Sequence, residues 1–328
     1  MVATHLTLRR MLVVLLALAT LWLCMALLSV CVGSTTYRPW QWWQAGADQQ
    51  LAKDVILQLR LPRTLAALAV GGLLALAGTV QQVLLRNPKA DPYVLGTAGA
   101  AGVGALLAML LGAGAVIVSV SAGVGAFASI LLVFLFAGYD RSAAQTRLLL
   151  TGVAVSSFCV ALNALLLSLA PDGLLRGMVF WLLGDLSGAD GAWPLAGLGV
   201  LLALIWPFAR DLNLLGHGVQ PAHALGLPIR RLRTGLYVLV AIATALAVTT
   251  AGMIGFVGLI VPHALRLMLG TDLRLLLPAS ALGGGIVLVL ADMVGRMVLA
   301  PQQIPVGVIT ALVGVPVFLW LLRQRGMT

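Results

Sequence analysis

The sequence predicts an all-α polytopic membrane protein with about ten transmembrane helices and both termini in the cytoplasm. Of its 328 residues, 61% are hydrophobic and only 9% are charged, and the mean hydropathy is +1.07. Soluble globular chains carry about 25% charged residues. Helices this poor in polar residues are apolar on all sides, which lipid accepts and water does not. The composition therefore excludes an ordinary soluble domain.

The first predicted span lies close to the start of the sequence. A bilayer is crossed by about 20 apolar residues, and Met11 to Val32 supplies them directly after Arg9 and Arg10. A signal peptide also starts with positive charge, but its apolar region is about 7 to 15 residues long and a soluble domain follows it. The longer apolar run, with further apolar segments behind it, favours a transmembrane helix.

Nine further apolar segments predict the remaining crossings. They are residues 64–85, 93–111, 114–137, 147–169, 191–208, 234–251, 254–268, 275–298 and 305–322. The segment 254–268 is short and interrupted by glycine, so it either crosses the membrane or re-enters it. With ten crossings the count is even, and both termini then lie on one side.

The positions of Lys and Arg orient these segments, because cytoplasmic loops retain positive charge. With the N-terminus inside, fourteen of the twenty Lys and Arg residues fall on the cytoplasmic side. The six on the opposite side are Arg38, Lys53, Arg60, Arg63, Arg176 and Arg296. The net charge of +10 is scattered over short loops, so topology and anionic lipid explain it, and a nucleic-acid partner is not expected.

Several patterns that would carry chemistry in a soluble protein have plainer interpretations here. Three single cysteines lack C-x-x-C spacing, and the four histidines lie in separate segments, so no metal site is expected. Ala67, Gly71 and Ala75 place a small residue at every fourth position of the second span. Such spacing lets helix backbones approach closely in lipid. These residues therefore predict helix packing, with no cofactor bound by the chain.

Acidic residues inside the predicted spans are scarce. The chain has no Glu, and Asp292 is the one acid placed well inside an apolar segment. A secondary transporter needs such groups near the membrane midplane. Arg296 follows Asp292 by one helical turn, so a structural ion pair is favoured over a proton relay. An ion-coupled secondary transporter stays the alternative of another class, and an integral membrane enzyme is disfavoured because its catalytic groups would cluster.

Five segments carry a resemblance to a known family. They are RLPRTLAAL from Arg60, QQVLLRNPKADPYVLG from Gln81, HALGLP from His223, GFVGLIVPHALR from Gly255 and IPVGVITALVGVPVFLWLL from Ile304. In content and order they resemble the FecCD family of type II ATP-binding-cassette permeases, which import cobalamin, ferric siderophores and haem. The resemblance covers nearly the whole chain and is strongest in its last third.

The resemblance implies a single permease domain over residues 1–328 and a set of partners. The chain is expected to form a homodimer with the transport path along the dimer axis, within the lipid of a bacterial inner membrane. Two ATP-binding subunits, which would bind ATP and Mg, and a periplasmic substrate-binding protein complete the expected assembly. No catalytic site is expected on this chain, and transport would proceed by alternating access.

Three arginines receive roles from the resemblance. Arg60 and Arg296 match arginines that meet carboxylates of the binding protein, a task for which the planar guanidinium fork is suited. The alternative is that both are interfacial anchors at helix ends. Arg176 would attract anionic groups of the substrate. Phe180 and Trp181 beside it either face a planar ligand or belong to an aromatic belt.

The segment 86–92 resembles the cytoplasmic gate loop, with Asn87, Pro88 and Lys89 as the gate residues. Pro88 and Pro92 cannot continue a helix, so a stiff turn is expected. Asn87 would bond the loop backbone or cross the dimer axis. Lys89 departs from the family, which usually has Leu there, and this puts a hydrophobic gate in doubt. A plain helix connector is the alternative.

A cytoplasmic loop at about 210–233 resembles the coupling segment that inserts into each ATPase. The residues that match the family are His223, Leu225, Gly226, Leu227 and Pro228. Gly218 stands where many relatives have Glu, which alters one expected contact. The arginines after this motif can also be simple topology determinants.

The sequence as a whole predicts the permease subunit of an ATP-driven importer. Haem or another iron chelate is the first cargo hypothesis, because polar residues are scarce along the spans and Arg176 can meet propionates. A cobalamin importer is the alternative.

Overall fold

The computed structural model describes residues 7–33, 50, 53–137 and 144–325. These residues form helices joined by short connections, and no strand occurs among them. The all-α membrane fold predicted from composition is confirmed. The terminal residues 1–6 and 326–328 lie outside the described residues, so the side on which the termini lie stays a prediction.

The helices follow one another with few long connections. The longest are α1 (Leu8–Cys31), α3 (Leu61–Leu84), α5 (Ala115–Ala137), α6 (Ala144–Ser168), α11 (Ile229–Ala251), α13 (Leu273–Met297) and α14 (Val306–Arg325). Shorter ones are α4 (Thr97–Leu110), α7 (Asp172–Leu182), α8 (Ala192–Ile205), α9 (Ala209–Gly216), α10 (Val219–Ala224) and α12 (Val257–Leu269). Single turns are η2 (Val55–Arg60), η3 (Pro92–Leu95) and η4 (Trp206–Phe208).

Each of the ten predicted spans coincides with a helix of the structure. Among the described residues, seven helical stretches are long and apolar enough to cross a membrane, and α4, α12 and α14 supply shorter apolar segments. The number of crossings therefore stays a prediction. Helix α7 was not predicted as a separate element. The expected span 93–111 is divided, because Gly96 at φ 76° ends η3 before α4 begins.

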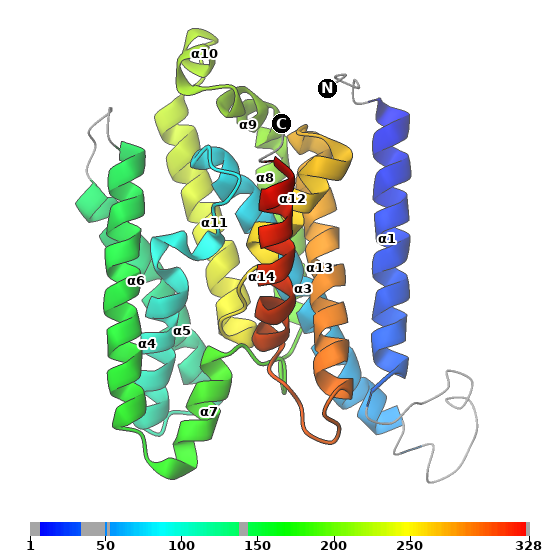
Figure 1. The fold of residues 1–328 in the computed structure, drawn as a ribbon, viewed down its shortest axis with the longest axis vertical. Helices are drawn as coiled ribbons and strands as arrows, with labels where there is room; N and C mark the ends of the chain where they lie inside the picture. Colours follow the sequence, from blue (N-terminus) through cyan, green and yellow to red (C-terminus); the bar gives the residue numbers. More distant parts are fainter. Residues whose placement is uncertain (1–6, 34–49, 51–52, 138–143, 326–328) are drawn as a thin grey trace.

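Helix α3 is the centre of the bundle. Its residues from Ala66 to Leu84 are all buried, and α13, α11, α12 and α8 pack around it. A helix that is apolar on all sides is expected at such a central position. Figure 1 shows α3 behind α14 and beside α13, with α1 on the far side of α13.

Glycines allow α3 to approach its neighbours at backbone distance. A Cβ on Gly71 would collide with the carbonyl of Gly284 in α13, and a Cβ on Gly78 would collide with the carbonyl of Gly258 in α12. A Cβ on Gly284 would in turn meet Ala75. The small residues predicted to serve packing in the second span thus do so, and they bring α12 and α13 against α3.

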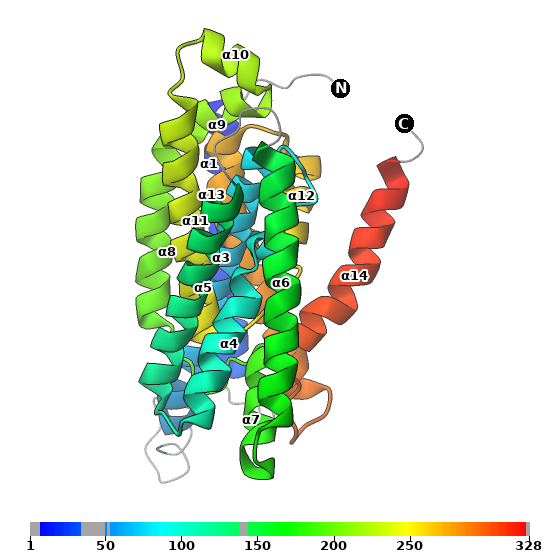
Figure 2. The same cartoon turned by 90° about the vertical axis from the view of Figure 1, so that its left-hand side faces the viewer.

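The two ends of the bundle differ in shape. Helix α1 begins, and α14 ends, at the end that carries α9 and α10, whereas α7 lies at the opposite end (Figures 1 and 2). We refer to these as the α10 end and the α7 end. Figure 2 shows α14 diverging from the other helices toward the α10 end.

Candidate functional site

A buried ion network lies at the α7 end, where α3 meets α13. Asp292 of α13, whose side chain is 1% exposed, lies 2.8 Å from Arg63 Nη2 of α3 and 2.9 Å from Arg296 Nε. The predicted pairing of Asp292 with Arg296 is confirmed. Arg63 was not predicted as a partner, although the charge pattern placed it on the same side of the membrane as Arg296. The network crosslinks the two central helices.

Two arginines at this end of the bundle also donate hydrogen bonds to the C-terminal end of α1. Arg296 Nη2 donates to Ser29 Oγ at 2.7 Å, and Arg60 Nη1 donates to the carbonyls of Val30 at 3.2 Å and Cys31 at 3.1 Å. The last carbonyls of a helix lack intrahelical donors and carry partial negative charge. The two guanidinium groups therefore hold the end of α1 against the bundle.

The predicted docking residues Arg60 and Arg296 are both buried, each with 6% of its surface exposed. Their guanidinium groups bond within the subunit, so they are neither open docking groups nor lipid-facing anchors in this conformation. Contact with a binding protein would require these bonds to open. Docking by Arg60 and Arg296 stays a prediction.

Arg63 connects the network to two loops at the α7 end. Its Nη1 donates to Ser187 Oγ at 3.3 Å and to the side-chain oxygen of Gln303. Ser187 follows α7, and Gln303 precedes α14. A movement of either loop therefore acts directly on the pair that joins α3 to α13.

Arg176 lies apart from this network, on the exposed face of α7. Its guanidinium carbon is 5.4 Å from the centroid of the Phe180 ring, one turn along the same helix. This distance is within the range of a cation–π contact. The arginine thus contacts an aromatic ring of its own helix, and its role in the transport path stays a prediction.

The predicted gate loop is a stiff turn at the C-terminal end of α3. Arg86 has φ 46°, and the N–H of Arg86 and of Asn87 bond the carbonyls of Val83 and Gln82, as in a Schellman motif. Asn87 Oδ1 accepts the N–H of Lys89 at 3.0 Å. Asn87 thus bonds the loop backbone, one of the two roles considered for it. Lys89 is exposed, and Pro88 beside it is half-buried.

The gate loop is tied to the linker between α11 and α12. Asp91 Oδ1 accepts the N–H of Tyr93 at 2.8 Å and so begins η3, while the Tyr93 hydroxyl accepts the N–H of Ile254 at 3.3 Å. Ile254 lies in the glycine-containing linker 252–256, where Phe256 has φ 69°. The family-like segment that begins at Gln81 therefore meets the linker before α12 in space.

Helices α9 and α10, with the residues that follow up to Pro228, form what we call the coupling arm. Asn213 of α9 donates to Asp272 Oδ1 at 2.9 Å and accepts the N–H of Leu273 at 2.9 Å. Asp272 also pairs with Arg274 at 2.7 Å. Burial favours a raised pKa for Asp272, but hydrogen bonds from Arg274 and Asn213 outweigh it and lower the pKa. The arm is thus fastened to the start of α13.

The tip of the coupling arm is exposed and partly apolar. Gly226 at φ 80° ends α10, with the N–H of Leu227 bonded to the carbonyl of Ala222 at 3.1 Å. His223, Leu225 and Pro228 are exposed, and Leu225 is 67% exposed. A leucine held in this way by backbone hydrogen bonds is suited to a partner's apolar groove. The five predicted coupling residues therefore lie together at one tip.

Comparison with known proteins identifies the family of this chain. The sequence profile described as the FecCD transport family matches residues 20–324. The chain belongs to the FecCD transport family. It is 40% identical over 315 residues, 94% of each chain, to the vitamin B12 import system permease protein BtuC of Salmonella arizonae, and equally to that of Salmonella typhimurium.

Solved structures agree with this assignment. An inward-facing metal-chelate type ABC transporter matches with a TM-score of 0.84 and 30% identity, covering 96% of this chain and 99% of that one. PsaBC from Streptococcus pneumoniae, in complex with Fab, matches with a TM-score of 0.55 and 18% identity over 82% of this chain and 93% of that one, which shows the fold alone. This family member is thus a multi-pass importer permease and not an enzyme.

Proposed function

We propose that this permease imports cobalamin or a closely related corrinoid. The observation that carries the proposal is the 40% identity to vitamin B12 permeases over 94% of both chains. The haem hypothesis drawn from the sequence has no specific observation behind it, because the relatives at 40% identity are vitamin B12 permeases. Cobalamin, the alternative in the sequence analysis, is therefore the better supported cargo.

The proposed assembly is a homodimer in a bacterial inner membrane, with two ATP-binding subunits and a periplasmic substrate-binding protein. The exposed tip at Leu225 supports docking of an ATPase at the α10 end. ATP and Mg would bind on that subunit. The loops attached to Arg63 lie at the opposite end, where a binding protein would deliver substrate.

Two hydrogen-bonded connections would carry motion from the coupling arm into the membrane helices. The first joins Asn213 of α9 to Asp272 at the start of α13. The second runs from Arg233, just after the arm, whose Nη2 donates to the Leu84 carbonyl at 3.0 Å. Leu84 ends α3 immediately before the gate loop. A displaced arm would thus move α13 and the gate loop together, as alternating access requires.

A metal chelate is the second candidate cargo. It is favoured by the likeness to a solved structure with 30% identity, that of a metal-chelate type ABC transporter. The two cargoes are both large metal chelates.

The experiment is reconstitution of the permease with its ATPase and binding protein in proteoliposomes, followed by uptake of radiolabelled cobalamin. We expect uptake that requires ATP and the binding protein, and that is absent with an ATPase unable to hydrolyse ATP. Uptake of a ferric chelate but not of cobalamin would replace the cargo. Uptake that persists without ATP and collapses with an ion gradient would contradict the importer itself.

A further inference from the structure

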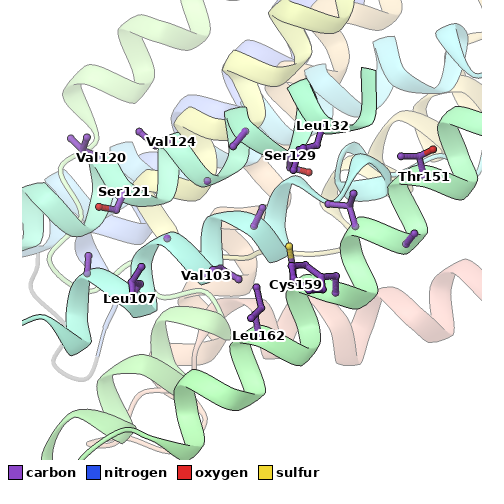
Figure 3. Close-up of a pocket in the computed structure, with 18 of the residues that line it drawn as sticks. Val103, Leu107, Val120, Ser121, Val124, Ser129, Leu132, Thr151, Cys159 and Leu162 are labelled. Carbon is purple, nitrogen blue, oxygen red and sulfur yellow. The ribbon is translucent and has the colours of Figure 1, made fainter. Parts of the chain in front are cut away.

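The helices of the bundle meet their neighbours through two kinds of contact. Between α4, α5 and α6 lies an apolar groove of about 1030 Å³, with Val103, Leu107 and Leu162 in its walls (Figure 3). The described residues that line it carry no charge, so dispersion and apolar burial govern the packing there. At the α7 end the contacts of Arg63 are instead directional hydrogen bonds, which can be broken and remade.

The guanidinium of Arg63 is divided between one buried partner and two exposed ones. Its Nε and Nη2 lie 2.9 and 2.8 Å from Asp292 Oδ1, in a side chain that is 1% exposed. Its Nη1 donates to Ser187 Oγ at 3.3 Å and to the side-chain oxygen of Gln303, and both of these residues are exposed. The planar fork of an arginine can serve both sides at once.

The two exposed partners belong to loops that lead into different helices. Ser187 lies in the α7–α8 loop (residues 183–191), and Gln303 lies in the α13–α14 loop (residues 298–305). Because α14 begins directly after the second loop, the bond to Gln303 ties the start of α14 to α3.

Helix α14 is packed closely at its start and loosely beyond it. A Cβ on Gly307 would collide with the Leu183 carbonyl of the α7–α8 loop. Leu312 and Trp320 are more than half exposed, and Figure 2 shows the far end of α14 separated from the other helices. A helix held only near one end moves as a lever when its contacts at that end change.

We propose that Arg63 is a latch that holds the α7–α8 and α13–α14 loops against α3 while the α7 end is closed. Its bonds to Ser187 and Gln303 break when this end opens, and its pair with Asp292 persists. This role rests on the alternating access of the proposed function. Arg63 is in it a positioning residue and does not touch the cargo.

The difference in burial explains why one contact persists and the others switch. Separation of the pair with Asp292 would leave buried charge without compensation, which is costly. Water replaces the two exposed bonds at a much smaller net cost. The buried carboxylate therefore keeps the guanidinium in place for the loops to bind again. We expect the two exposed bonds to favour the closed state by about tenfold.

The test removes the two exposed bonds and leaves the buried pair in place. Ser187→Ala combined with Gln303→Ala does this. Gln302→Ala, at the neighbouring exposed position, is the matched control and leaves every hydrogen bond of Arg63 intact. Both variants are prepared as the full transporter with its ATPase and binding protein in lipid nanodiscs. Both should unfold at the wild-type temperature, because the changed side chains are exposed.

Two spin labels measure the opening by pulsed electron paramagnetic resonance. Ala192→Cys lies beside Gly191, where a Cβ would collide with the α3 backbone at Ala66, so this label reports the position of α3. Leu299→Cys lies in the α13–α14 loop, where Leu299 is 55% exposed. The native cysteines replaced by Ala are Cys24, Cys31 and Cys159.

Without nucleotide, the double variant should show a population at longer distance that is small in the wild type. We expect its ratio of open to closed molecules to rise about tenfold, and Gln302→Ala to match the wild type. A wild-type distance distribution in the double variant would overturn the latch, and so would an equal change in both variants.

Arg63→Lys tests whether both loops act through the arginine. Lysine keeps a positive charge beside Asp292 but lacks the fork, so the open population should rise as it does in the double variant. Combining Arg63→Lys with Ser187→Ala and Gln303→Ala should add nothing further, because each change removes the same contacts. Additive increases would show that the two loop residues act independently of Arg63, and the latch would be wrong.

Cobalamin uptake by the wild type, measured in proteoliposomes from the same preparation, separates the latch from the proposed function. Uptake by the wild type together with unchanged distances in the double variant overturns the latch and leaves the proposed function standing. Changed distances in the double variant, without cobalamin uptake by the wild type, support the latch and contradict the proposed cargo.

Discussion

The α7 end and the α10 end of the bundle are held together by different means. At the α7 end Asp292, Arg63 and Arg296 form a buried ion network, and the end of α1 is bonded into it. At the α10 end the gate loop and coupling arm are shaped by backbone capping, and side chains such as Leu225 face outward. The ion network at the α7 end resists separation of the helices. The α10 end instead exposes side chains that a partner protein can contact.

Because of this difference, substitutions at the α7 end should mainly affect the stability of the protein, and substitutions at the α10 end should mainly affect its coupling to the ATPase. Buried charges are costly when a partner is removed, because the remaining charge is left without compensation. Exposed side chains contribute little to folding but can dominate a contact with another protein. We therefore expect the loss of stability to decrease from the α7 end to the tip of the coupling arm, while the loss of ATPase coupling increases.

The largest loss of stability is expected for Asp292→Ala. It leaves Arg63 and Arg296 buried side by side without their carboxylate, at a cost of about 3 to 5 kcal/mol in unfolding free energy. Thermal unfolding of the detergent-solubilised protein measures the loss. Asp172→Asn, at an exposed position of α7, is the control and should unfold as the wild type does.

Combining Asp292→Ala with Arg63→Gln sharpens that result. A double-mutant cycle isolates the energy of the pair when each single change removes the same contact. The double variant should be more stable than Asp292→Ala alone, because one uncompensated charge has been removed. Strictly additive losses would show that the 2.8 Å pair of Arg63 with Asp292 contributes nothing to the crosslink.

The second largest effect is expected between the two ends, for Gly78→Ala. Its Cβ collides with the Gly258 carbonyl, so α3 and α12 must separate, and overpacking of this kind costs about 1 to 3 kcal/mol. The same change at Gly235, which has open space around it on α11, is expected to stabilise by about 0.4 to 1 kcal/mol. Equal unfolding temperatures of the two variants would contradict the close packing of α3.

A loss of stability of the same order, accompanied by a loss of coupling, is expected for Asn213→Ala. It removes two hydrogen bonds between α9 and the start of α13, each worth about 0.5 to 1.5 kcal/mol. Because the bond from Asn213 to Asp272 helps to lower the pKa of Asp272, the contribution of that bond is complete at neutral pH and is lost only in acid. ATP hydrolysis without cobalamin uptake in proteoliposomes is the expected outcome. Normal coupling would remove Asn213 from the transmission path.

The sequence predicts local relations in this molecule better than distant ones. Composition alone predicts the membrane fold, and the spacing of one helical turn predicts the ion pair of Asp292 with Arg296. Arg63 was missed because it lies 229 residues from Asp292, and no periodicity connects two separate helices. The bond of Asn213 to Asp272 was missed for the same reason. Helix α7 was missed because its 11 residues are too few for a span.

The candidate site shows the same limit. Family-like motifs grouped His223 and Leu225 in one short segment, and both lie at one exposed tip in the structure, because a short segment with glycine punctuation is a local feature. Their contact with an ATPase stays a prediction. The burial of Arg60 and Arg296 was not predicted. It depends on the packing of the end of α1 against α3 and α13, and these contacts join residues that are far apart in the sequence.

The smallest effect on stability, and the largest on assembly, is expected at the tip of the coupling arm. Leu225→Glu changes a side chain that is 67% exposed, so the unfolding free energy should change by at most about 0.5 kcal/mol. Co-purification with the ATPase should nevertheless be lost, because a carboxylate replaces the apolar side chain offered to the partner's groove. Leu174→Glu makes the same change on α7, where Leu174 is 41% exposed, and should leave the association intact. Equal loss of association in both variants would show that the added charge, and not the position of Leu225, disrupts the complex. In that case the α10 end would not differ from the α7 end in its importance for binding the ATPase.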